Sequence, residues 1–207
     1  MTRSDRNAPA SGRNSARLSL SAVLVIGLTV LPTGQAMSRE NSPAAKPSAP
    51  EVAPRGQRAA NDLRYGEWRK LCFRAGGAKT LCRTTITGTF ETGQTAVRLD
   101  LIEREGDQSG RLQLFVPVGM YLQIPAKLTV DQGKPYPLPY NWCLTNACIA
   151  ADVADPKLIR EMESGKTLTL EVIDSNLLAL TIPLPLAQFA PTHKGPPAQT
   201  LEQDIDE

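Results

Sequence analysis

Apolar and polar residues alternate with a period of two along much of the middle of the chain. Val97, Leu99 and Leu101 alternate with Arg98 and Asp100, which is typical of a half-buried β-strand. Turn-forming sequences such as "RAGG", "GDQSG" and "DQGK" separate stretches of this kind. We expect seven strands, at residues 66–73, 81–90, 97–102, 111–116, 122–130, 167–173 and 177–182. They predict an all-β fold, either a single β-sandwich-like domain or a small barrel.

One stretch, "DPKLIREMESGK", has helical spacing instead. Asp155 suits an N-cap, Pro156 suits the first helical position, and Gly165 follows the expected end. Its apolar residues lie at helical spacing, so the sequence predicts one short helix that covers an open end or face of the sheets.

The N-terminal segment, residues 1–36, has the pattern of a signal peptide. Four arginines precede an apolar run at residues 18–31, which is shorter than the roughly 20 residues a helix needs to cross a bilayer. Small residues follow up to Ala36, where we expect cleavage. The alternative is that the segment is kept as an anchor. We therefore expect an exported protein in the periplasm or at the envelope, without a transmembrane span in the mature chain.

Two segments are rich in Pro, Ala and small polar residues and have few large apolar side chains. They are a linker at residues 37–62 and a tail at residues 190–207, and both are predicted to be disordered because they bury too little surface to offset ordering entropy. His193 lies in the tail, where we expect a solvated residue. Residues 63–189 between these segments suffice for one domain.

Charge argues against a nucleic-acid partner. The whole chain carries +2, but removal of residues 1–36 takes away four arginines and one aspartate and leaves about −1. The folded part is therefore expected to offer no positive stripe for nucleic acid.

The four cysteines are Cys72, Cys82, Cys143 and Cys148, an even number in an exported chain, which predicts two disulfides. Three pairings are possible. We favour the two local pairings, Cys72 with Cys82 and Cys143 with Cys148, because the glycines of "FRAGGAKTL" can turn one strand back on the next and "LTNA" can close a small loop. A zinc site is the alternative, although the spacing suits a zinc knuckle badly.

Catalytic chemistry has few candidates. His193 is the only histidine, and acidic residues such as Asp100, Asp131 and Asp152 show no spacing that marks a catalytic pair. We expect no enzyme, with no catalytic, metal-binding or cofactor-binding residues. The alternative is a periplasmic hydrolase of envelope polymers that uses acidic residues.

Four sequence landmarks occur in a characteristic order: "YGEWRKLC", "TLCRTTI", "LFVPVGMYLQIPAKLTVDQGK" and "WCLTNACIAA". Together they resemble the invasion-associated locus B family of exported proteins from Gram-negative bacteria, over nearly all of residues 63–182. The resemblance implies an all-β domain in the periplasm or at the envelope, no defined catalytic residues and, for some members, a part in host-cell entry. We therefore expect a non-catalytic binding or structural module, with an unknown envelope or host protein as its partner.

An aromatic segment, "PYPLPYNWC", is the candidate partner surface. It places Tyr136, Tyr140 and Trp142 among three prolines, a semi-rigid arrangement that could present a face to another protein. The alternative is that the rings cover the end of the domain and pack on the Cys143 disulfide.

Overall fold

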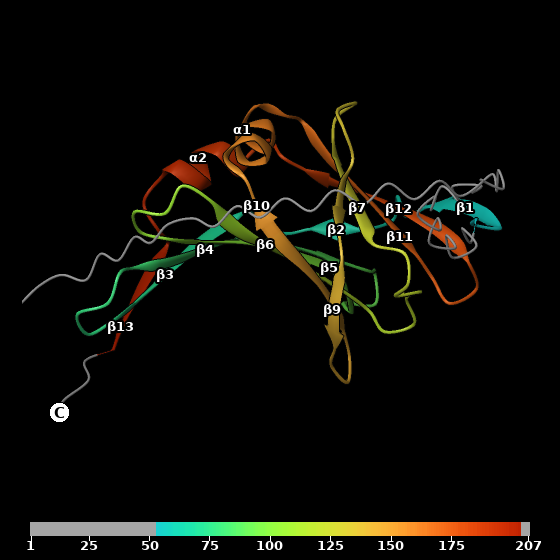
Figure 1. The fold of residues 1–207 in the computed structure, drawn as a ribbon, viewed down its shortest axis with the longest axis horizontal. Helices are drawn as coiled ribbons and strands as arrows, with labels where there is room; N and C mark the ends of the chain where they lie inside the picture. The colour runs from blue at the N-terminus through green and yellow to red at the C-terminus, as the bar shows by residue number, and fades with distance from the viewer. Residues whose placement is uncertain (1–52, 204–207) are drawn as a thin grey trace, which may run out of the picture. The chain divides into compact units, whose positions relative to one another are not determined.

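The structure, a computed structural model, describes residues 53–203 and contains two open β-sheets (Figure 1). We call them sheet A and sheet B. Sheet A contains, in spatial order, β1 (Gly56–Ala59), β12 (Leu178–Pro185), β11 (Thr167–Ile173), β7 (Ala126–Val130) and β8 (Tyr136–Leu138). Sheet B contains β13 (Gln199–Gln203), β3 (Arg69–Ala75), β4 (Leu81–Thr89), β5 (Thr95–Arg104), β6 (Gly110–Val116), β10 (Cys148–Ala154) and β9 (Tyr140–Cys143), and β2 (Arg64–Tyr65) also pairs with β4. The all-β, sandwich-like prediction is confirmed, and neither sheet closes into a barrel.

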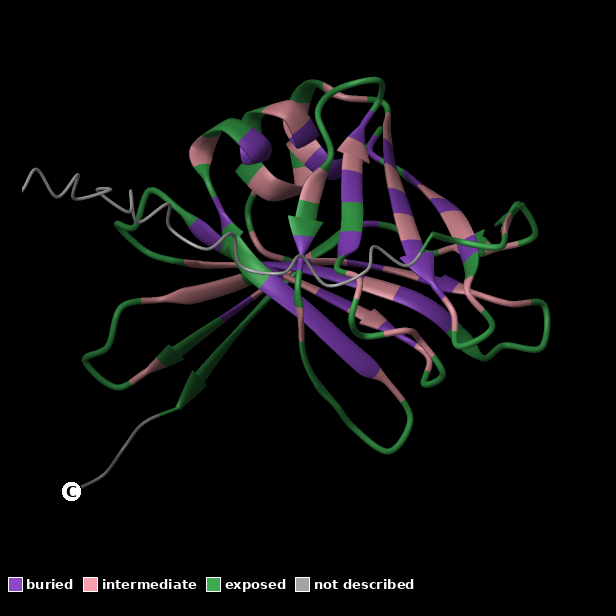
Figure 2. Cartoon of the chain, turned by 45° about the vertical axis from the view of Figure 1, so that its right-hand side comes forward, coloured by how far each residue is buried: buried purple, intermediate pink, exposed green. Residues whose placement is uncertain are grey.

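The core lies between the inner faces of the two sheets. Alternate residues of β5 and β6, such as Leu99, Leu101 and Leu114, are fully buried, as are Leu128 of β7 and Leu170 of β11. Figure 2 shows the resulting alternation of buried and more accessible positions along the strands of sheet A. The period of two in the sequence is therefore the period of side chains that enter this core.

The predicted helix is confirmed as α1 (Pro156–Ser164). The carboxylate of Asp155 accepts a hydrogen bond from the backbone N–H of Leu158 at 2.7 Å, and the N–H of Gly165 donates to Glu161 O. Its apolar face is buried in the core at Leu158, Ile159 and Met162. Sheet A and the helices lie on the same side of sheet B in Figure 1.

The predicted disordered tail is wrong for residues 190–203. They contribute to a second helix, α2 (Phe189–Lys194), and to β13, which pairs in parallel with β3. All five residues of β13 are exposed, so backbone hydrogen bonding to β3 holds the strand and no buried side chain reveals it in the sequence. β1 likewise occupies part of the predicted linker and pairs in parallel with β12. The predicted signal peptide, residues 37–52 of the linker and residues 204–207 lie outside the described residues.

Several strand boundaries differ from the prediction. Residues 122–125 belong to a turn, so that strand begins at Ala126, and β8, β9 and β10 were not predicted. β12 continues past Ile182 through Pro183 and Pro185. Its neighbour β1 pairs only as far as Thr181, so both prolines lie where β12 has no partner strand on that side and no N–H is needed. Neither described helix combines the length and the apolar character needed to span a membrane.

The glycine that ends α1 is enclosed by other atoms. A Cβ at Gly165 would lie 2.4 Å from Val130 Cγ1 and 2.9 Å from Glu161 O. We expect Gly165→Ala to lower the free energy of unfolding by about 1–3 kcal/mol through overpacking, as measured by urea denaturation. Gly66→Ala is the matched control, because the nearest atom to its Cβ would be Thr87 O at 3.8 Å. Equal losses in the two variants would contradict the steric explanation.

Candidate functional site

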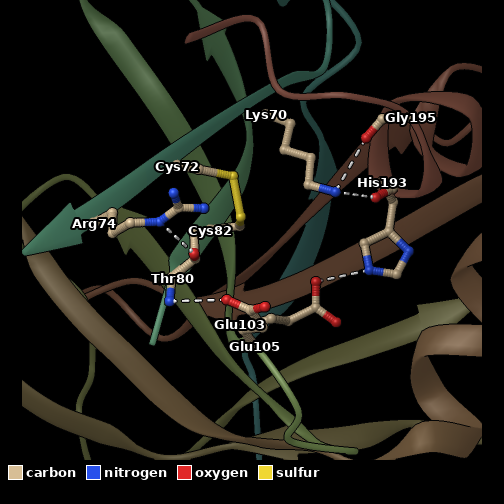
Figure 3. The surroundings of a disulfide bond; sticks show 9 residues. All are labelled: Lys70, Cys72, Arg74, Thr80, Cys82, Glu103, Glu105, His193 and Gly195. Carbon is tan, nitrogen blue, oxygen red and sulfur yellow. Dashed lines mark hydrogen bonds and ion pairs between the residues drawn. A yellow bond between two sulfur atoms is a disulfide. The ribbon is translucent and has the colours of Figure 1, made fainter. Parts of the chain in front are cut away.

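An open hollow of about 560 Å³ lies beside the first disulfide, at the end of sheet B that β13 borders (Figure 3). β3, β4 and β5 supply one part of its wall, and the C-terminal segment supplies the other. Its lining residues are Lys70, Cys72, Arg74, Thr80, Cys82, Glu103, Arg104, Glu105, Asp107, His193, Pro197 and Thr200.

Both predicted disulfides are present. Cys72 and Cys82 lie directly opposite each other on β3 and β4, and Cys143 and Cys148 are opposite on β9 and β10. Each bond therefore links neighbouring antiparallel strands and acts as a local staple. With all four sulfurs paired, none is a free thiol for catalysis or metal binding.

His193 connects the C-terminal segment to two other elements. Its Nε2 lies 2.7 Å from Glu103 Oε2 on β5, and its Nδ1 lies 2.9 Å from Glu163 Oε1 on α1. The side chain is only 13% exposed, and its ring stacks on Phe189 with the centroids 5.3 Å apart. The prediction of a solvated tail histidine is wrong because Phe189 anchors α2 in the core and brings His193 between the two carboxylates.

Electrostatics favours the protonated imidazole. The hydrogen bond with Glu103 raises the pKa of His193, burial acts in the opposite direction, and the hydrogen bond with Glu163 raises it further. Burial also acts to raise the pKa of Glu163, but hydrogen bonds from Lys194 and His193 outweigh burial and lower it. A protonated imidazole donates through both nitrogens, so this ring has no free nitrogen to act as a general base.

The rest of the hollow is lined by polar groups that bond to one another. Lys70 Nζ donates to the carbonyl oxygens of His193 at 2.7 Å and Gly195 at 3.1 Å, which holds the chain after α2 (Figure 3). Thr80 N–H donates to Glu105 Oε2 at 3.3 Å, and hydrogen bonds from Thr80 lower the pKa of Glu105. Charges of both signs meet here, and residues 53–203 contain no group of three or more His, Cys, Asp or Glu arranged to hold a metal ion.

The three aromatic residues of the predicted partner surface have different surroundings. Tyr136 O–H donates to Glu161 Oε2 on α1 at 2.8 Å, and its pKa is raised, mainly by burial. Tyr140 packs against the core, where burial raises its pKa to about 12. Trp142 is 43% exposed on β9. Of the three, Trp142 is therefore the side chain most available to a partner, and a partner surface here stays a prediction.

The acidic residues considered for a hydrolase serve separate local contacts. Asp100 pairs with Arg98 on sheet B, and Asp131 accepts from the N–H groups of Lys166 and Thr167. Asp152 accepts from the N–H of Val153 next to it. These hydrogen bonds and ion pairs give each of the three carboxylates its own partners.

Sequence reasoning missed the cluster of His193, Glu103 and Glu163. These residues come from α2, β5 and α1, so no local spacing joins them. The one available signal was Phe189, a large apolar side chain at the predicted end of the domain, which is fully buried.

Comparisons with known proteins bear on the family and the fold of this chain. The family model described as invasion associated locus B (IalB) protein matches residues 68–197, more than half of the chain. Among solved structures, the crystal structure of invasion associated protein B from Bartonella henselae is similar, with a TM-score of 0.53 and 23% sequence identity. The alignment covers 61% of this chain and 88% of that one. At this identity the likeness shows the fold. No match was found among curated proteins.

The raised pKa of His193 makes stability depend on pH. Its contribution is fully present below the ordinary histidine pKa of about 6.5 and is lost as pH rises through the higher folded pKa. We expect unfolding free energy to fall with pH above about 6.5, by at most about 1.4 kcal/mol per pH unit from this group. Urea denaturation across that range should show a weaker pH dependence for His193→Gln. An unchanged slope would show that folding does not raise the pKa of His193.

Phe189 is the apolar anchor of the C-terminal segment. It is fully buried and packs edge-on against Trp68 with the centroids 4.8 Å apart. We expect Phe189→Ala to cost about 3–5 kcal/mol and to speed limited proteolysis near α2. Phe73→Ala serves as the control because Phe73 is 39% exposed, and it should cost much less. Equal losses would mean that α2 is not anchored through Phe189.

Proposed function

We propose that this chain, which belongs to the invasion associated locus B family, is a non-catalytic binding or structural module of the periplasm or cell envelope. The observation that carries the proposal is that both ring nitrogens of the chain's one histidine are engaged in hydrogen bonds. Both ring nitrogens of His193 are bonded to carboxylates, and its ring is stacked on Phe189. The imidazole therefore joins elements of the fold and has no free nitrogen for a substrate.

The disulfides support an exported location. Two bonds between neighbouring strands persist in an oxidising compartment such as the periplasm, whereas cytosolic thiols are kept reduced. The signal-like pattern of residues 1–36 agrees with this location. A part in host-cell entry is proposed from the family resemblance alone.

The partner we expect is an envelope or host protein that contacts β9 and the loop after it. β9 is the last strand of sheet B, and Trp142 and Leu144 expose 43% and 54% of their surface there. An exposed tryptophan beside an exposed leucine at a strand edge is a common anchor of protein interfaces. Tyr140 on the same strand and Tyr136 on β8 both pack against the core, so they are less available to a partner than Trp142.

The positions of the carboxylates do not favour the hydrolase alternative. Glu103 and Glu163 do lie on opposite sides of one point, but the His193 ring fills the space between them. A water or a glycosidic bond would have to displace a ring that is held by two hydrogen bonds and a stacking contact.

Crosslinking in intact cells that export the full chain tests the partner surface. We expect Trp142→Ala to abolish recovery of a specific crosslinked protein, because the variant removes the exposed anchor. Leu122→Ala should retain it, because Leu122 is 46% exposed but lies in the turn before β7. Both variants must first show unfolding transitions like that of the parent chain. A partner that is retained in Trp142→Ala would place the interface elsewhere.

A second arm addresses catalysis directly. The chain is incubated with purified envelope polymer, and we expect no soluble fragments. Asp152→Asn is the most informative variant because Asp152 is exposed and, among residues 53–203, accepts a hydrogen bond only from the N–H of Val153. Fragment release that stops in this variant would overturn the non-catalytic proposal.

A further inference from the structure

The outer face of sheet B is open. Sheet A and both helices lie on the opposite side of this sheet, and no described element covers the outer face in Figure 1. The strand register places alternate residues there, opposite in direction to the buried leucines of β5 and β6. Many of the side chains on the outer face, among them Arg69, Arg111 and Val153, are exposed.

Five arginines point from this face. They are Arg69 on β3, Arg83 on β4, Arg98 and Arg104 on β5, and Arg111 on β6. The register gathers them on neighbouring strands: Arg83 and Arg111 lie on either side of Ile102, and Arg69 lies opposite Thr85, which itself lies opposite Asp100. Asp100 is the only acidic strand residue on this face among the described residues. The whole chain carries only +2, so the arginines represent local segregation of charge.

Asp100 forms ion pairs with two of these five arginines, and the other three lack this partner. Its side chain is 1% exposed although it lies on the outer face, and it pairs with Arg98 at 3.3 Å and with Arg83 at 4.0 Å. The Arg98 guanidinium also lies 3.6 Å above the centre of the Phe115 ring. One carboxylate thus neutralises one positive charge.

Arg69, Arg104 and Arg111 are different. All three are exposed, and none makes an ion pair with another residue that the structure describes. A guanidinium presents a planar fork of N–H donors that matches the oxygens of a phosphate, so this part of the face can bind an anion.

Exposed apolar side chains border the arginines toward both edges of the sheet. Phe73 on β3 is 39% exposed and lies directly beside Leu201 of β13, which is 51% exposed. Toward the other edge, Val153 of β10 lies opposite Arg111 and is 64% exposed. Trp142 of β9 lies opposite Ile149 of β10. The face therefore combines a cationic middle with apolar borders.

We propose that the outer face of sheet B docks on an anionic lipid surface. Phosphate headgroups would meet the free arginines, while the apolar side chains at both edges would enter the boundary between headgroups and acyl chains. Tryptophan suits this boundary because its ring is amphipathic. A soluble polyanion would satisfy the arginines but leave the apolar borders in water, so the lipid surface accounts for more of the face. The inference goes beyond the proposed function and relies on it only for access to such lipids.

Flotation of the full chain with vesicles tests the proposal. The vesicles contain phosphatidylglycerol mixed with phosphatidylcholine, and vesicles of phosphatidylcholine alone are the neutral control. We expect binding to the anionic vesicles that weakens with added salt. The triple variant Arg69→Gln, Arg104→Gln and Arg111→Gln should bind roughly 100-fold more weakly, since each arginine near an anionic membrane contributes about a fivefold factor.

The matched control removes the same charge elsewhere. Arg58→Gln, Lys134→Gln and Arg160→Gln alter exposed residues on β1, in the turn after β7 and on α1, and this variant should bind like the parent. Tryptophan emission gives a second readout. Trp142 is exposed and Trp68 is 5% exposed, so a blue shift on binding reports entry of Trp142 into the vesicle surface.

Four results would overturn the proposal. They are no binding to anionic vesicles, an equal loss in both triple variants, tighter binding to a soluble polyanion such as DNA than to vesicles, and a dimer of the chain that only the outer-face variant dissolves. These results do not depend on the proposed non-catalytic role. Failure of lipid binding leaves the crosslinked partner and the polymer assay unaffected, and the reverse also holds.

Discussion

The packing of Phe189 between Trp68 and His193 holds the two sheets and both helices together. Trp68 lies just before β3 of sheet B, and its indole N–H donates to Pro185 O at the end of β12 in sheet A at 2.8 Å. Phe189 of α2 packs against Trp68 at this contact between the sheets. His193, stacked on Phe189, bonds in turn to Glu103 on β5 and Glu163 on α1. The burial of one aromatic ring thereby orders a segment whose own composition is polar and rich in proline. The position of β13 and the wall of the hollow beside the first disulfide depend on this contact.

The charge distribution shows why net charge is a poor guide to surfaces. A nearly neutral chain led us to expect no positive stripe, yet five arginines share the outer face of sheet B. They come from four strands, and the pairing of those strands brings them together. Asp100 is buried among them, where its charge is balanced by Arg98 and Arg83 and by a hydrogen bond from Thr85. A buried carboxylate on an open face is stable because it is paired on several sides.

The structural contacts of this domain lie apart from the surfaces that we propose for interaction. The histidine cluster and the disulfides bind parts of the fold to one another, and their polar atoms are largely engaged. The accessible features lie elsewhere, at the β9 edge with Trp142 and on the arginine-rich outer face. The chain belongs to the invasion associated locus B family, and its binding role is our proposal.

Features that rest on neighbouring residues in the chain could be predicted from the sequence. Alternation in β5 and β6 revealed half-buried strands, Asp155 and Gly165 revealed α1, and the short spacing of the cysteines indicated both disulfide pairs, because each of these features is local. Tertiary structure decided the rest. β13 is held by backbone bonds that carry no side-chain signature, and His193 meets Glu103 across 90 residues of chain. Strand pairing places residues that are distant in sequence next to one another, and no local pattern encodes it. It therefore decides both the gathering of arginines on one face and the different surroundings of Tyr136, Tyr140 and Trp142.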